Sequence, residues 1–255
     1  MYPHSFWWHY LWVAPHVLQL VIAVMLIRRR LFHEFPRFLA YTLFESVQGA
    51  SLLVLDHSSA ISATQYWNTH WVGMLITIVL RFAVIHEIFA HVFRPYPALI
   101  ELSRLLLRWM TAALVLVAVA VTATTPAPKD TPYLLSGIHV LDRAVGLVQS
   151  GLVVSLFLLC AYFRLYWRSY AYGIAMGLGV FASVDLGTAA FRLWIGITTA
   201  GAYRLDFVTM ATYHCCVLIW LVYLLAPETA RQTVLELPDN NLEQWNAEMQ
   251  RLLLR

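Results

Sequence analysis

The sequence predicts an all-α protein that crosses a membrane seven times. Two observations come from composition: 60% of the 255 residues are hydrophobic and only 12% are charged, whereas a soluble domain carries about 25% charged residues. The third is that the apolar residues gather in seven stretches, and a helix needs about 20 residues to cross the hydrocarbon core. This composition excludes an ordinary soluble enzyme, a disordered chain and a nucleic-acid-binding protein.

The predicted spans follow one another with short connections. The first begins with Trp and Tyr residues that are typical of a membrane interface. The third is long enough to tilt, and the fourth has an uncharged core of Ala, Val and Leu. The second and the sixth are the most polar. The seven predicted spans are 6–27, 38–56, 67–93, 105–124, 138–163, 171–195 and 206–226.

The loops between these spans alternate between basic and nearly neutral. Nine arginines lie in or beside one set of loops, whereas the other set holds only Lys129 and Arg204. Since basic loops stay in the cytoplasm, we expect the N-terminus outside and the C-terminus inside the plasma (inner) membrane. The nine arginines are Arg28, Arg29, Arg30, Arg37, Arg94, Arg104, Arg108, Arg164 and Arg168.

The chain divides into a membrane domain, residues 1–227, and a cytoplasmic tail, residues 228–255. Within the tail, Asn240 suits a helix N-cap and Glu243 follows three residues later. Apolar residues then recur on one helical face, as in helices that lie on a membrane or bind a partner. Residues 239–255 are therefore expected to contact the inner leaflet or a protein partner.

Small residues recur at every fourth position in the sixth span. Gly173 and Gly177 form a GxxxG motif, and a second series at every fourth position consists of Ala175, Gly179, Ser183 and Gly187. Small residues let two helix backbones approach closely in lipid. We expect this stripe to pack the sixth helix inside the bundle rather than to form a dimer.

Polar side chains near the middle of the spans need a physical explanation, because burying them in a bilayer is costly. A bundle that brings them together would form either a pocket for a small ligand or a hydrogen-bond network that fixes helix register. The sequence leaves both interpretations open. The midplane candidates for ligand binding are His16, Gln149, Ser150, Asp185 and His214.

A second polar group is expected nearer the inner surface. Glu45 and Arg81 are predicted to form a buried ion pair, and Glu45, His86 and Glu87 are the candidates for a metal site. His86 and His91 are five residues apart, which separates them by about 140° around a helix. The pattern is therefore not the HExxH of a zinc protease. Nearer the outer surface, a second ion pair is predicted between Asp142 and Arg192.

The sequence is similar in two places to uncharacterised bacterial membrane proteins. The similar strings are Glu34-Phe35-Pro36-Arg37-Phe38 and Tyr166-Trp167-Arg168-Ser169-Tyr170-Ala171-Tyr172-Gly173. The number and the orientation of the spans also resemble those of bacterial seven-helix sensory modules. This resemblance implies a bundle with a sensory or receptor-like role, but it rests on topology and identifies no ligand.

The sequence supports two functional hypotheses. In the first, the protein is a receptor-like, sensory or scaffold module that binds a small ligand or a partner within the bundle and needs no cofactor. In the second, it is a membrane redox or metal protein, in which His16 and His214 hold haem b or the inner side chains hold a metal ion. A transporter is disfavoured because the sequence has no internal repeat. No catalytic motif predicts an enzyme.

Overall fold

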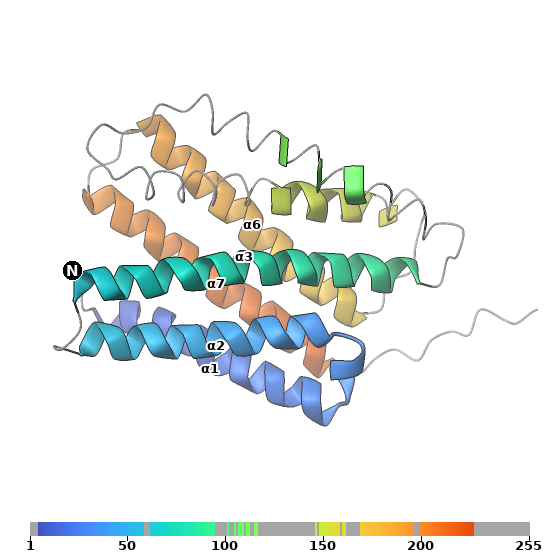
Figure 1. Ribbon diagram of the computed structural model, residues 1–255, viewed down its shortest axis with the longest axis horizontal. Helices are drawn as coiled ribbons and strands as arrows, with labels where there is room; N and C mark the ends of the chain where they lie inside the picture. The colour runs from blue at the N-terminus through green and yellow to red at the C-terminus, as the bar shows by residue number, and fades with distance from the viewer. Residues whose placement is uncertain are drawn as a thin grey trace, which may run out of the picture.

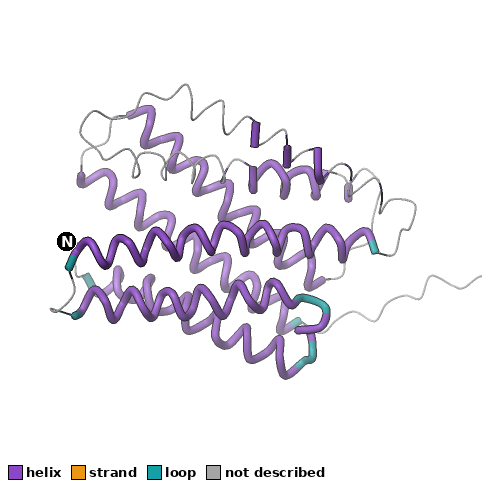
Figure 2. Tube along the Cα trace, in the orientation of Figure 1, coloured by secondary structure: helices purple, strands orange, loops and turns teal. Residues whose placement is uncertain are grey.

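The computed structural model is helical, and Figure 2 shows the described residues almost entirely as helix, with a short turn between the first two long helices. The structure describes residues 5–58, 62–94, 169–195 and 199–226, with short runs between 101 and 116 and between 146 and 161. No strand occurs among these residues. The helices are α1 (Phe6–Arg28), α2 (Pro36–His57), α3 (Ala63–Phe93), α6 (Ser169–Ile195) and α7 (Thr199–Leu225), with a short 3-10 helix at Leu31–His33.

Five helices in the described residues are long and apolar enough to cross a membrane. They correspond to the predicted first, second, third, sixth and seventh spans, so the helical fold class is confirmed for the described residues, with five candidate membrane-spanning helices. A shorter apolar helix, Val148–Leu158, lies within the predicted fifth span. The predicted span 105–124 lies largely, and the predicted tail helix at 239–255 entirely, outside the described residues.

Two predicted helix boundaries are wrong. Helix α3 begins at Ala63 rather than at residue 67, because Ser62 and Gln65 form a capping box that satisfies its first free N–H groups. The predicted loop 196–205 is also too long, since α7 already begins at Thr199. Both helices therefore extend further than hydropathy alone indicates.

The helices alternate in direction, as successive spans of one chain must. Arg29, which follows α1, donates from Nη1 to the carbonyl oxygen of Leu224 at the end of α7, over 2.6 Å. The same nitrogen lies 3.3 Å from the hydroxyl of Tyr170, at the start of α6. Helices α1 and α7 therefore run in parallel and α6 runs against them, while α6 crosses α3 obliquely (Figure 1).

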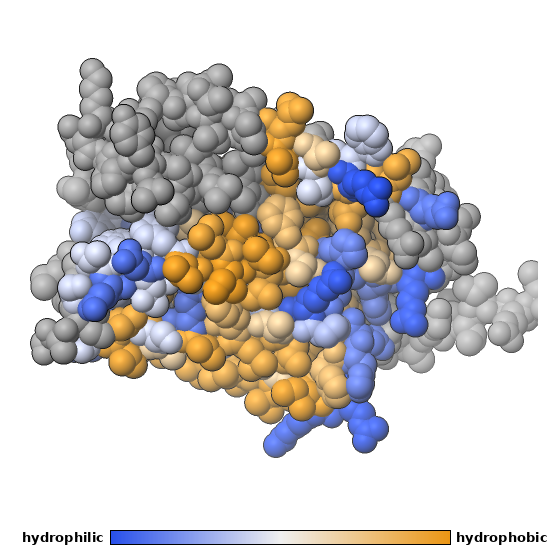
Figure 3. Space-filling view, viewed as in Figure 1, coloured by the Kyte–Doolittle hydropathy of each residue, from blue (hydrophilic) through white to orange (hydrophobic). Residues whose placement is uncertain are grey.

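The two ends of the bundle differ in charge. One end, called the basic end below, is where α1, α3 and α7 finish and where α2 and α6 begin. Figure 3 shows hydrophobic residues over the middle of the visible face and hydrophilic residues toward both ends. The described arginines at the basic end are Arg28, Arg29, Arg30, Arg37 and Arg94.

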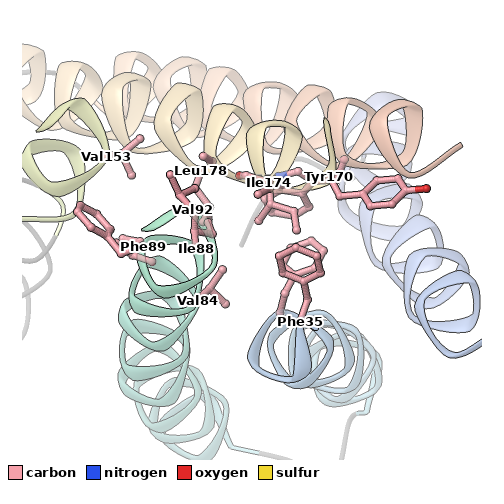
Figure 4. Packing of buried hydrophobic residues seen from close by; sticks show 14 of the residues in the cluster. Phe35, Val84, Ile88, Phe89, Val92, Val153, Tyr170, Ile174 and Leu178 are labelled. Atoms are coloured by element: carbon pink, nitrogen blue, oxygen red, sulfur yellow. Dashed lines mark hydrogen bonds between the residues drawn. The ribbon is translucent and has the colours of Figure 1, made fainter. Parts of the chain in front are cut away.

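The apolar core fills the half of the bundle nearer the basic end. Its members come from the later turns of α1, α3 and α7, from the earlier turns of α2 and α6, from the α1–α2 connection and from the short helix within the predicted fifth span. Figure 4 shows Phe35 facing Ile174, and Ile88 beside Leu178. The largest fully buried side chains there are Trp220, Tyr41, Phe35, Phe38, Ile22, Leu26, Ile85, Ile88, Leu152, Leu156, Ile174 and Leu178.

The glycines of α6 pack that helix against α7, as predicted. A Cβ atom on Gly177 would lie 2.1 Å from Nε1 of Trp220, and one on Gly173 would lie 2.4 Å from Cβ of Tyr223. The close approach also lets the Trp220 indole donate a hydrogen bond of 3.2 Å to the carbonyl oxygen of Ile174. Gly173 and Gly177 thus serve contact within the chain.

Candidate functional site

A cavity of about 490 Å³ occupies the half of the bundle away from the basic end. Helices α1, α2, α3, α6 and α7 all line it, so it lies inside the bundle rather than on one surface. Its walls begin at Trp8 and Tyr66, near the first turns of α1 and α3, and reach Glu45 and Arg81 near the middle of α2 and α3. The apolar core therefore occupies the half of the bundle nearer the basic end, and the cavity occupies the other half.

The floor of the cavity is a hydrogen-bond network that joins four helices. Nδ1 of His16 and Oε1 of Gln19 lie 3.3 Å apart on α1, and Nε2 of Gln19 donates to the hydroxyl of Tyr213 on α7. That hydroxyl donates a long hydrogen bond of 3.5 Å to Oε2 of Glu45 on α2. Oε1 of Glu45 accepts a hydrogen bond of 2.7 Å from Thr77 on α3. These five residues are called the floor network below.

Two glycines make room for this network. A Cβ atom on Gly49 would lie 2.3 Å from Cδ2 of His16, so only a glycine lets the imidazole lie against α2. The contact is strengthened by Ser46, whose hydroxyl donates to the carbonyl oxygen of His16 over 3.1 Å. A Cβ atom on Gly73 would lie 2.0 Å from Nε2 of Gln48, which places that amide between α2 and α3.

Arg81 lies beside the floor network with its guanidinium over the ring of Phe181, 4.6 Å from the ring centroid. Glu45 and Tyr41 are within electrostatic range of Arg81. No ion-pair contact joins Arg81 to Glu45 in the described residues, and Nε of Arg81 is buried with no hydrogen-bond partner. The two residues predicted to pair thus line one cavity, while the direct pair stays a prediction.

The prediction that separated Glu45 and Arg81 from the midplane group is wrong. Both residues line the same cavity as His16. Glu45 is near the middle of α2, which extends from Pro36 to His57. Helix α2 begins two residues before the predicted second span. The depth of Glu45 relative to His16 depends on which helices meet, and hydropathy does not show this.

The predicted midplane group is brought together only in part. His16 and Asp185 line the cavity, whereas His214 does not. His214 follows Tyr213 and is therefore turned by about 100° around α7. Its Nε2 atom lies 3.5 Å from the hydroxyl of Tyr10 instead. His16 and His214 thus face different surroundings, and this arrangement does not fit a pair of axial haem ligands.

The remaining predicted site residues lie elsewhere. Gln149 and Ser150 are buried, but neither lines the cavity, and Nε2 of Gln149 and Oγ of Ser150 have no hydrogen-bond partner in the described part of the chain. Asp142 and the side chain of Arg192 lie outside the described residues. The helix that carries Gln149 reaches the cavity only through Gly146.

The candidate metal ligands serve other contacts. The carboxylate of Glu87 accepts the backbone N–H groups of Arg37 and Phe38, over 2.9 and 3.0 Å, and so caps the first turn of α2. His86 contacts Nη1 of Arg37 over 2.8 Å. Glu45 lies about 11 Å further along α2. No three His, Cys, Asp or Glu side chains in the described residues are placed to share a metal ion.

Sequence reasoning missed three members of the floor network: Gln19, Thr77 and Tyr213. A signal existed for Gln19, which follows His16 by three residues, and for Thr77, which precedes Arg81 by four. Both spacings place side chains on one helix face. No comparable signal marked Tyr213, because its neighbour His214 is equally polar and only the packing of α7 decides which of them faces inward.

The cavity combines the chemistry that small-molecule sites use. Aromatic side chains line it together with a few charged and hydrogen-bonding groups, and such polar groups fix a ligand's orientation while the apolar wall supplies affinity. No protein-family model, curated protein or solved structure matches the chain.

Proposed function

We propose that the protein is a receptor-like or sensory membrane module that binds a small ligand in the cavity between its helices. One observation carries this proposal: a cavity of about 490 Å³ has aromatic walls and a charged, hydrogen-bonded floor. Sites for small molecules measure about 300–1,000 Å³ and combine the same two kinds of surface. A purely structural polar network would not need open space above it.

The floor network supplies a means of response. A ligand that touches His16, Glu45 or Tyr213 changes hydrogen bonds that hold α1, α2 and α7 at fixed positions. Differential contact of this kind is what shifts a protein between two conformations. With the N-terminus outside, the cavity would open toward the exterior and the basic end would carry the response to the cytoplasm.

The test uses the protein purified in a mild detergent and a panel of neutral, cationic and anionic aromatic compounds. Trp8 and Trp12 line the cavity, so binding is expected to change tryptophan fluorescence and to raise the thermal unfolding temperature. We expect saturable binding by at least one class. A panel without any binder, or a purified protein with a Soret band, would contradict the proposal.

A matched pair of variants connects binding to the cavity. Thr209 lines the cavity, whereas the adjacent Val208 is 45% exposed and does not. Thr209→Trp should fill the cavity and abolish binding, while Val208→Trp should leave binding unchanged. Equal effects of the two variants would place the binding site elsewhere.

A further inference from the structure

We propose that the ligand is a small organic carboxylate with an apolar body, and that Arg81 binds its carboxylate group. This inference rests on the proposed function, because it names the chemical class that the cavity takes. Four charged side chains line the cavity: Glu45, Arg81, Asp185 and Asp206. Their contacts indicate the chemistry of the ligand.

Arg81 has the geometry of an unfilled anion site. Its guanidinium stacks on Phe181 at 4.6 Å from the ring centroid, so one face is covered while the edge, which carries the N–H donors, is left to other partners. The Nε atom of Arg81 is buried without a hydrogen-bond partner, although the Tyr41 side chain interacts with the guanidinium. A planar fork of N–H groups held in this way matches the two oxygens of a carboxylate.

The acidic side chains of the cavity are already engaged. The two carboxylate oxygens of Glu45 accept hydrogen bonds from Thr77 and Tyr213, over 2.7 and 3.5 Å. Asp185 and Asp206 have interactions of their own. Among the described charged residues that line the cavity, Arg81 alone has a buried nitrogen or oxygen atom without a hydrogen-bond partner. The proposed ligand therefore offers its negative group to this N–H donor.

The position of Arg81 adds to this argument. A charged side chain deep in a membrane-spanning helix is costly, and such residues usually mark ligand or ion sites. A partner that makes only a distant electrostatic interaction recovers little of that cost. A ligand carboxylate in the cavity would supply both the charge and the hydrogen bonds that Arg81 lacks.

The apolar walls define the rest of the ligand. Leu11 and Trp12 on α1, Leu52 on α2 and Met210 on α7 line the cavity together with Phe181. These side chains offer contact to a ring or a short hydrocarbon chain and few directional bonds. A carboxylate joined to one such apolar group is the simplest molecule that satisfies both the walls and Arg81.

The experiment compares three probes that share a phenylpropyl body: 3-phenylpropionate, its neutral amide, and 3-phenylpropylamine. Binding to the full chain is measured by tryptophan fluorescence and by thermal shift. We expect the carboxylate to bind at least about tenfold more tightly than the amide, and the amine to bind no better than the amide. Tighter binding of the amine, or equal binding of carboxylate and amide, would overturn the inference.

Variants then test the role of Arg81. Arg81→Gln should remove the preference for the carboxylate, Arg81→Lys should keep part of it, and Arg37→Gln at the basic end should leave it intact. Should Arg81→Gln fail to fold, the ratio of carboxylate to amide affinity in Arg81→Lys decides. Binding of neutral or cationic compounds alone would refute the carboxylate assignment and leave the proposed function standing. A complete absence of binding would refute both.

Discussion

The hydroxyl group of Tyr213 lies where three helices meet. It accepts a hydrogen bond from Gln19 on α1 and donates one to Glu45 on α2, while its own backbone belongs to α7. Gln19 is 0% exposed, so no water replaces this partner if the hydroxyl is lost. A buried donor without a partner costs more than the average hydrogen bond contributes.

Tyr213→Phe is therefore expected to lower the free energy of unfolding by about 1 kcal/mol, the magnitude found for polar contacts between membrane helices. The measurement is equilibrium unfolding in detergent micelles. Tyr223→Phe is the matched control, because Tyr223 lies on the same helix and its hydroxyl makes no hydrogen bond to any of the described residues. A loss of equal size in both variants would mean that the floor network contributes nothing to stability.

At this scale the sequence predicts the site only in part. His16 and Asp185 are conspicuous because they interrupt apolar spans, and both line the cavity. Tyr and Thr are common in such spans, so composition does not distinguish Tyr213 and Thr77 from their neighbours. Which side chain faces inward depends on how each helix is rotated within the bundle, and rotation is set by contacts between residues distant in sequence.

At the scale of the helices, hydropathy predicts most of what the structure describes. The five described spans lie where the apolar stretches place them, because a bilayer requires about 20 apolar residues per crossing. The errors arise where polar residues continue a helix beyond the hydrocarbon core, as at the capping box of Ser62 and Gln65. The remote cap of α2 by Glu87 was not predictable, since its partners Arg37 and Phe38 lie 50 and 49 residues away.

Gly177 provides a test of helix packing. Gly177→Ala is expected to destabilise the bundle by about 1–3 kcal/mol, because the new methyl group would overlap the indole of Trp220. Gly187→Ala is the control on the same helix, since a Cβ atom at Gly187 meets nothing within 4 Å. That change should be neutral or stabilising, as alanine is the better helix former. Thermal unfolding in detergent measures both variants, and an equal response would contradict the close α6–α7 contact.

At the scale of the whole molecule, the two halves of the bundle differ in how they are packed. The half at the basic end holds the apolar core, and the other half holds the cavity. Neither the sequence pattern nor the charge distribution predicts this division, because apolar residues fill the spans at both depths. It emerges only from the rotation and crossing of the helices.

The predicted orientation of the chain in the membrane can be tested at this scale. With seven spans and a cytoplasmic basic end, an epitope at the N-terminus should be accessible to antibody on intact cells. An epitope at the C-terminus should become accessible only after the membrane is permeabilised. The reverse result would contradict the charge-based orientation. Both epitopes on one side would require an even number of spans.

The contact between α1 and α7 also has a consequence for biosynthesis. Gln19 and Tyr213 are 194 residues apart in the chain, and translation at about 5–20 residues per second needs roughly 10–40 s to cover that distance. For most of this interval both Gln19 and Glu45 have been made, while the hydroxyl that joins them does not yet exist. Polar groups in lipid need hydrogen-bond partners. Until α7 is inserted, the side chains of Gln19 and Glu45 must therefore contact water or the insertion machinery. The floor network is therefore completed late in synthesis, and a chain truncated before α7 lacks the hydroxyl that joins Gln19 to Glu45.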